Sequence, residues 1–209
     1  IILTLIIISG EIDLSIASMI ALTAVIFGTA YNAGLGMPIS MIIALLSGTL
    51  CGLFNGILVT QLQIPSIILT IGTLTLYRGI AQSLASDFSL GGYPSWFIGI
   101  DYRYVGIVPI PVIIFTVFAI VVGFFLSSTI YGKQLYLIGT NPQTAKYSGI
   151  KVDRIKLLLF TLSGLVCGIA GILTTSRLAV ARFNMATGAE LEIVLMVMLG
   201  GTYIFGGRG

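Results

Sequence analysis

Long apolar runs, separated by short polar connections, place the strongest limit on how this chain can fold. A membrane span takes about 20 apolar residues, and residues 39–60, 66–86, 109–128 and 157–175 reach that length. Ile16 to Tyr31 is a further apolar stretch. Backbone groups inside lipid must hydrogen-bond within the protein, and a helix achieves this within one segment. The sequence therefore predicts an all-α, polytopic transmembrane helical bundle.

Composition narrows the function classes. Only 8% of the residues are charged, whereas a soluble domain carries about 25%. The chain has no His, and Cys51 and Cys167 lie in separate apolar runs, where small core residues are expected. We therefore expect no catalytic residue, no metal site and no cofactor, and a membrane enzyme is a poor fit. The lipid bilayer is the expected partner. Nucleic acid is not, because half of the basic residues lie in one juxtamembrane segment.

The two ends of the chain lead to a prediction about its extent. It begins inside a short apolar run, Ile1 to Ile8, without a Met, and it stops at Gly209 directly after a glycine-rich stretch. We expect residues 1–209 to be a single transmembrane domain, a fragment of a longer protein truncated at both ends.

One long polar segment, Tyr131 to Lys156, interrupts the apolar runs and carries five of the ten Lys and Arg residues. Positive charge next to membrane spans stays on the cytoplasmic side, so we expect a cytoplasmic loop here. The segment from Asp87 to Val108 is rich in aromatic residues and holds two acids, Asp87 and Asp101. One span separates the two segments, which places this one on the outer side.

The middle of the polar segment predicts a short helix. Asn141 can cap a helix N-terminus, and Pro142 suits the first helical position, where an N–H would be unpaired anyway. Gly149 offers a left-handed stop. The helix displayed to the cytosol would involve Asn141, Pro142, Ala145, Tyr147, Ser148, Gly149 and Ile150. The alternative interpretation is a stabilised re-entry loop that docks nothing.

Polar residues also interrupt the first apolar stretch, at Gly10, Glu11, Asp13 and Ser15. Acids are costly in lipid, so they should face water, protein or a pathway. Gly10 can bend the backbone, and Asp13 or Ser15 can cap the helix that follows. Two interpretations stay open. This is either a broken helix lining a substrate pathway, or an ordinary turn at the membrane surface with two solvated acids.

Two polar residues within the later spans are further pathway candidates. Asn55 lies beside a stripe of glycines, and a hydrogen bond to a neighbouring helix is the simpler interpretation. Arg78 lies inside an apolar run, where a structural partner is favoured over contact with a substrate. Glycines spaced by three or four residues predict close helix packing on two spans, at Gly48, Gly52 and Gly56 and at Gly164, Gly168 and Gly171.

The C-terminal part carries two local signals. Thr187 to Glu190 fits a capping box, in which Thr187 caps a helix and Glu190 reaches back to its N–H. The stretch from Gly200 to Gly209 holds five glycines, which indicates backbone that bends sharply or approaches another segment closely.

Several of these stretches together resemble a known family, over essentially the whole chain. They are SGEIDLSIAS (9–18), GLFNGILV (52–59), LTIGT (69–73) with LYRG (76–79), the polar segment 131–156, and LGGTYIFGGRG (199–209). The chain resembles the membrane-spanning permease subunit of bacterial ABC importers for monosaccharides, a group that includes the ribose, xylose, rhamnose and autoinducer-2 permeases. Glu11 departs from the pattern, since a Gly is common there. SLGGYPSWF (89–97) and SGIKVDR (148–154) are most similar to the autoinducer-2 permeases.

The resemblance implies a function and a set of partners. The chain would translocate a monosaccharide or an autoinducer-2-like small sugar across the inner membrane, powered by a separate cytosolic ATPase subunit. The short helix at 142–148 would be the coupling helix that docks on this ATPase. A second permease subunit, identical or homologous, and a periplasmic sugar-binding protein would complete the importer, and the permease itself would hydrolyse nothing.

A different class of transporter is the alternative. An ion-coupled secondary transporter could use broken helices with acids, and Glu11 and Asp13 would then be the coupling residues. The capped, exposed helix in the polar segment favours the importer, because a secondary transporter has no ATPase to dock.

Overall fold

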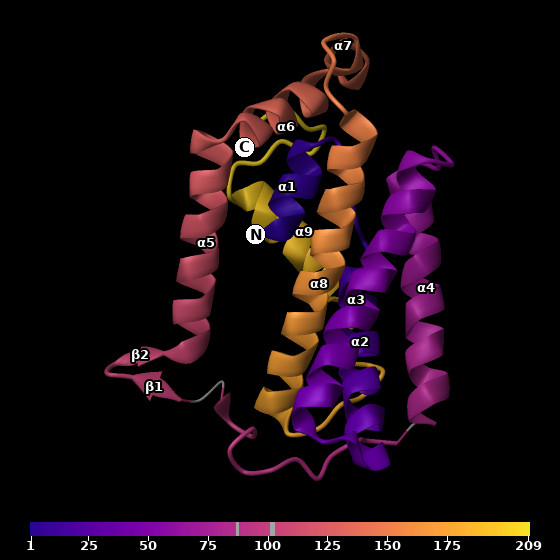
Figure 1. The fold of residues 1–209 in the computed structure, drawn as a ribbon, viewed down its shortest axis with the longest axis vertical. Helices are drawn as coiled ribbons and strands as arrows, with labels where there is room; N and C mark the ends of the chain where they lie inside the picture. The colour runs from indigo at the N-terminus through magenta and orange to yellow at the C-terminus, as the bar shows by residue number, and fades with distance from the viewer. Residues whose placement is uncertain (87, 101–102) are drawn as a thin grey trace.

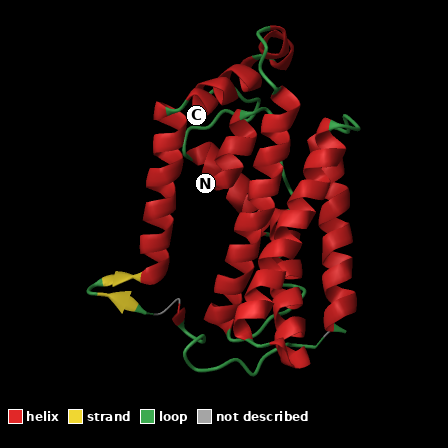
Figure 2. Cartoon of the chain, in the orientation of Figure 1, coloured by secondary structure: helices red, strands yellow, loops and turns green. Residues whose placement is uncertain are grey.

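The computed structural model describes residues 1–86, 88–100 and 103–209, and nearly all regular structure in these ranges is helical (Figure 2). Asp87 and Asp101, the two acids expected on the outer side, lie outside the described residues. Within the described part, five helical segments are long and apolar enough to cross a membrane. They are α2 (Ile16–Ala30) with its π-helical extension η1 (Tyr31–Leu35), α3 (Met37–Thr60), α4 (Ser66–Ala85), α5 (Ile110–Ser128) and α8 (Val152–Leu178).

The shorter elements lie around these spans. The helices are α1 (Ile2–Ile8), α6 (Ile130–Thr140), α7 (Pro142–Tyr147) and α9 (Ala189–Leu199). Two-residue strands β1 (Tyr104–Val105) and β2 (Val108–Pro109) form a small antiparallel hairpin, with Tyr104 opposite Pro109. The predicted helical bundle is confirmed, and this hairpin is its one departure in the described ranges.

The helices α2, α3, α4 and α8 form the bundle, whereas α5 stands apart from it (Figure 1). No side chain of α5 is buried, so its apolar surface is available to lipid. The helix α7 lies at one end of the long helices and the β-hairpin lies at the other (Figure 1). The basic segment and the aromatic segment therefore occupy opposite ends, as their charge and composition predict.

The centre of the bundle is the contact between α3 and α8. A Cβ atom added to Gly52 would lie 2.2 Å from the carbonyl oxygen of Phe160, and one added to Gly164 would lie 2.1 Å from that of Gly48. Only glycine permits backbones to approach this closely. The two glycine stripes predicted as packing faces thus pack against each other.

Two predictions near the membrane ends are wrong. The segment expected to be a loop from Tyr131 contains the helix α6, whose first turn is capped by Thr129 Oγ1, which accepts from the N–H of Gly132 at 3.1 Å. Leu135 and Ile138, three residues apart on α6, are both buried, so one face of this charged segment packs against the bundle. The helix α8 likewise begins at Val152, before the apolar run itself.

The predicted capping box is also wrong. The residue that caps α9 is Gly188, with φ of +87°, so the helix begins one residue later than the box requires. The hydroxyl of Thr187 instead donates to the carbonyl of Asn184 at 2.7 Å. The residue that caps this helix is the one whose backbone is left-handed, and the sequence pattern alone does not locate that residue.

Candidate functional site

The helix α7 is built as its sequence predicts. The side-chain oxygen of Asn141 accepts from the N–H groups of Gln143 and Thr144, both at 3.0 Å. Pro142 takes the first helical position. Gly149 follows the helix with φ of +82°, a conformation that favours glycine. These local hydrogen bonds make a six-residue helix a defined, rigid element.

The two faces of α7 differ. Ala145 is buried and packs with Ile138 and Val152 in a small apolar cluster, which Ile150 flanks. Tyr147 points the other way and is 90% exposed. Ala145 therefore holds α7 against its own bundle, and Tyr147 is a large side chain that α7 exposes.

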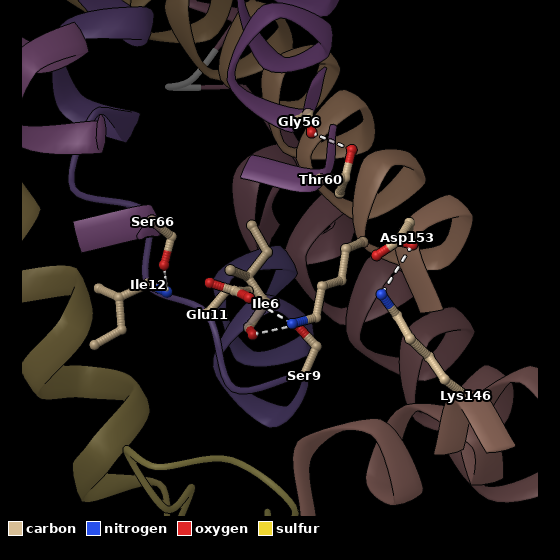
Figure 3. A network of polar contacts seen from close by, with 10 residues as sticks. Ile6, Ser9, Glu11, Ile12, Gly56, Thr60, Ser66, Lys146 and Asp153 are labelled. Atoms are coloured by element: carbon tan, nitrogen blue, oxygen red, sulfur yellow. Dashed lines mark hydrogen bonds and ion pairs between the residues drawn. The ribbon is translucent and has the colours of Figure 1, made fainter. Parts of the chain in front are cut away.

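An ion pair ties α7 to the start of α8. Lys146 Nζ lies 3.1 Å from a carboxylate oxygen of Asp153, seven residues along the chain (Figure 3). Both side chains are exposed, so we expect the pair to contribute at most about 1 kcal/mol. With the apolar cluster, it makes α7 move together with the cytoplasmic end of α8.

The first apolar stretch is broken, as predicted. The helix α1 ends at Ile8 and α2 begins at Ile16, and Gly10 between them has φ of +82°. Asp13 is only 1% exposed. Its Oδ1 accepts from both the N–H and the hydroxyl of Ser15, at 2.9 and 2.6 Å. The interpretation of a surface turn with two solvated acids is therefore wrong for Asp13.

A chain of side-chain hydrogen bonds leads to Asp13 from two other helices. The hydroxyl of Tyr77, on α4, donates to Asn55 Oδ1 at 2.9 Å, and Asn55 Nδ2, on α3, donates to Ser15 Oγ at 2.9 Å. Ser15 then donates to Asp13. Asp13 Oδ2 makes no hydrogen bond of ordinary geometry within the residues that the structure describes, and the buried hydroxyl of Ser163, on α8, lies near the carboxylate. The break is thus tied into the bundle interior.

This network confirms the hydrogen bond predicted for Asn55 and adds a residue that the sequence analysis did not single out. Tyr77 is buried and stands beside Arg78 in the LYRG stretch. Its signal was weak, because a lone Tyr in an apolar span is more often an ordinary packing residue. Only the positions of α3 and α4 show that its hydroxyl meets Asn55.

The side chains of Glu11 and Arg78 have hydrogen-bond partners outside the Asp13 network. Glu11 forms an ion pair with Lys156 on α8, and the two side chains are 16% and 12% exposed. Figure 3 shows Glu11 near the break, with the pair of Lys146 and Asp153 close by. Arg78 donates to the carbonyls of Phe183 and Met185, at 2.8 and 2.7 Å. The prediction for Arg78 is a pair with an acid; its hydrogen bonds here are to these backbone carbonyls, which fasten α4 to the segment before α9.

The C-terminal glycine stretch lies against the break. The N–H of Gly207 donates to the carbonyl of Ile8 at 2.9 Å. A Cβ atom added to Gly139, near the end of α6, would lie 2.3 Å from the nitrogen of Gly207. The close approach predicted for this stretch is confirmed. Three segments therefore meet where α6, which leads into α7, crosses the end of α1.

Neutralising one member of the Glu11–Lys156 pair is expected to destabilise the protein. Glu11→Gln would leave a poorly solvated ammonium group without its partner, at a cost of about 3 kcal/mol. The charge-swapped double variant Glu11→Lys/Lys156→Glu should recover most of this loss. Thermal unfolding in detergent measures both effects. Lys146→Met, which removes the exposed pair, is the matched control and should change the midpoint little. An equal fall in the unfolding midpoint in the single and the double variants would show that pairing of the two charges does not stabilise the protein.

Comparison with known proteins identifies the family. Residues 2–207 match the family described as "Branched-chain amino acid transport system / permease component". The chain is 35% identical, over 213 aligned positions, to the "Autoinducer 2 import system permease protein LsrD" of Escherichia coli (strain K12) and to the proteins of that name from Shigella flexneri and Escherichia coli O157:H7. The alignment covers 99% of this chain and 64% of each relative. No solved structure matches the chain.

These matches give no support to an ion-coupled transporter, and Glu11, one of the two acids it would use, is held by Lys156. Five membrane-spanning helices within the described ranges and the family match agree on a multi-pass protein of the inner, or plasma, membrane. The chain belongs to the family described as "Branched-chain amino acid transport system / permease component".

Proposed function

We propose that the chain is the permease part of an ABC importer that carries a monosaccharide or an autoinducer-2-like small sugar inward. A separate cytosolic ATPase powers it, and the permease itself catalyses no reaction. The observation that carries this proposal is α7, a capped helix that offers an exposed Tyr147 at the basic end of the bundle. The relatives named as autoinducer-2 import permeases favour a small sugar-like substrate over an amino acid.

Three protein partners belong to this proposal. The ATPase receives α7 through the residues around Tyr147. A second permease subunit, the same or homologous, completes the pathway, and a periplasmic sugar-binding protein delivers substrate at the opposite end. The hairpin β1–β2 and the segment 88–100 lie at that end (Figure 1), which makes them the surface available to such a protein.

The break between α1 and α2 is our proposed pathway element. Asp13, Ser15 and Asn55 form one buried network there, and Oδ2 of Asp13 has hydrogen-bonding capacity for a sugar hydroxyl. Gly10 and Glu11 belong to the same break, whereas Arg78 is the weakest candidate because backbone carbonyls already occupy it. The break contacts α6, and α6 leads directly into α7. Movement of α7 can therefore be transmitted to the break through α6.

The test is isolation of the full-length protein from its native membranes in a gentle detergent, with assay of any associated ATP-hydrolysing subunit. We expect a stoichiometric ATPase with the wild-type protein. Truncation of an exposed aromatic anchor costs about 2–4 kcal/mol at an interface, so Tyr147→Ala should retain less than about a tenth of it. Lys133→Ala, an exposed change on α6, should retain all of it. A protein that purifies without an ATPase and transports on an ion gradient would refute the proposal.

A further inference from the structure

A second candidate site lies at the α7 end of the bundle. A pocket of about 630 Å³ is enclosed there by the end of α5, by α6 and by the start of α8. Apolar side chains line it, among them Phe125, Leu135 and Leu158. Lys151 and Arg154 line the pocket as well. Nothing in the transport scheme above uses this pocket.

The two cations in this pocket, Lys151 and Arg154, form no ion pair with the residues that the structure describes. The ion pairs in the described ranges join Lys146 to Asp153 and Lys156 to Glu11, so Lys151 and Arg154 have no carboxylate partner there. No acidic side chain lines the pocket. Both cations are exposed. The pocket therefore has an excess of positive charge next to an apolar wall.

The depth of the pocket in the membrane determines which ligand fits it. Phe125 is in the last turn of the span α5, and Leu158 is in the second turn of the span α8. Lys151 and Arg154 come just before, at the start of α8. The apolar wall thus lies where acyl chains end, and the cations lie where lipid headgroups begin. Basic pockets between membrane helices on the cytoplasmic side are suited to anionic lipid headgroups.

We propose that this pocket binds one anionic phospholipid of the cytoplasmic leaflet. Lys151 and Arg154 hold its phosphate, and an acyl chain lies along Phe125 and Leu158. Gly149 and Ile150 also line the pocket, and they directly follow α7. The bound lipid therefore contacts the base of the docking helix and stabilises its position on the bundle.

Native mass spectrometry of the full-length protein in detergent tests the proposal, with phosphatidylglycerol and phosphatidylcholine of the same acyl chains as probes. We expect one retained phosphatidylglycerol and no retained phosphatidylcholine. Each juxtamembrane cation contributes about fivefold to affinity for an anionic lipid, so Lys151→Gln and Arg154→Gln should each weaken retention about fivefold, and the double variant about 25-fold. Lys133→Gln, an exposed cation on α6 outside the pocket, should leave retention unchanged.

Two further measurements distinguish binding of a lipid in the pocket from attraction by its positive charge alone. Leu158→Trp fills the apolar side while keeping both cations, and it should weaken retention at least tenfold without changing the unfolding temperature, since Leu158 is exposed. Glycerol phosphate, the soluble headgroup, should not displace the lipid at millimolar concentration. Equal retention of both lipids, or equal losses in Lys133→Gln and Lys151→Gln, would overturn the proposal. So would full displacement by glycerol phosphate, or a pocket that holds no lipid.

Discussion

Gly164→Val is expected to prevent α3 and α8 from packing and to leave little folded protein in the membrane. A Cβ atom at this position would lie 2.1 Å from the carbonyl oxygen of Gly48 and 2.8 Å from the nitrogen of Gly52. Both obstacles are backbone atoms, which cannot move aside by changing a rotamer. The helices must therefore separate along their whole contact, which places the cost at about 3 kcal/mol or more, the upper end for overpacking.

The matched control for this prediction is Gly123→Val on α5. A Cβ atom at Gly123 meets nothing within 4 Å, so the same chemical change should be tolerated at a lipid-exposed position. The yield of monodisperse protein and its thermal unfolding midpoint measure both variants. If Gly164→Val and Gly123→Val behave alike, the glycine contact between α3 and α8 does not hold the bundle together.

Asp13→Ala is expected to reduce uptake at least tenfold while the ATPase still copurifies. The change removes the acceptor for both the N–H and the hydroxyl of Ser15, and it removes the end of the hydrogen-bond chain from Tyr77. Loss of these hydrogen bonds costs about 1 kcal/mol each, which the bundle should survive. The larger effect is on the break itself, where our proposal places contact with the substrate.

Uptake of labelled ribose and autoinducer 2 into cells with the complete importer measures this effect. Asp13→Asn separates the two roles of the side chain, because an amide oxygen can still accept from Ser15. We expect Asp13→Asn to lose uptake as well, since the carboxylate no longer meets the substrate. Normal uptake in Asp13→Asn would mean that Asp13 only holds Ser15, the residue at the N-cap position of α2. Glu192→Ala, an exposed acid in the first turn of α9, is the control and should transport normally.

The features that the sequence determined by itself are those with local causes. Apolar runs of sufficient length predict the spans, because lipid excludes unpaired backbone groups. The basic segment predicts which end faces the cytosol. Asn141, Pro142 and Gly149 predict α7, because a cap, a first-turn proline and a left-handed stop act within a few residues of each other. Glycine spacing on two spans predicts a close-packing face on each, but it does not predict that these two faces meet.

The tertiary structure alone decided which distant residues meet. Glu11 and Lys156 are 145 positions apart, and Asn55 reaches Ser15 across 40. No local pattern distinguishes these partners from other polar residues in the spans. The direction in which Ala145 points and the pocket around Lys151 likewise depend on how α6, α7 and α8 are placed. The physical reason is the same in each case. The apolar composition of a span predicts only that the span enters the membrane. Its buried polar groups must form hydrogen bonds or ion pairs with whichever helix packs beside it, and the sequence does not show which helix that is.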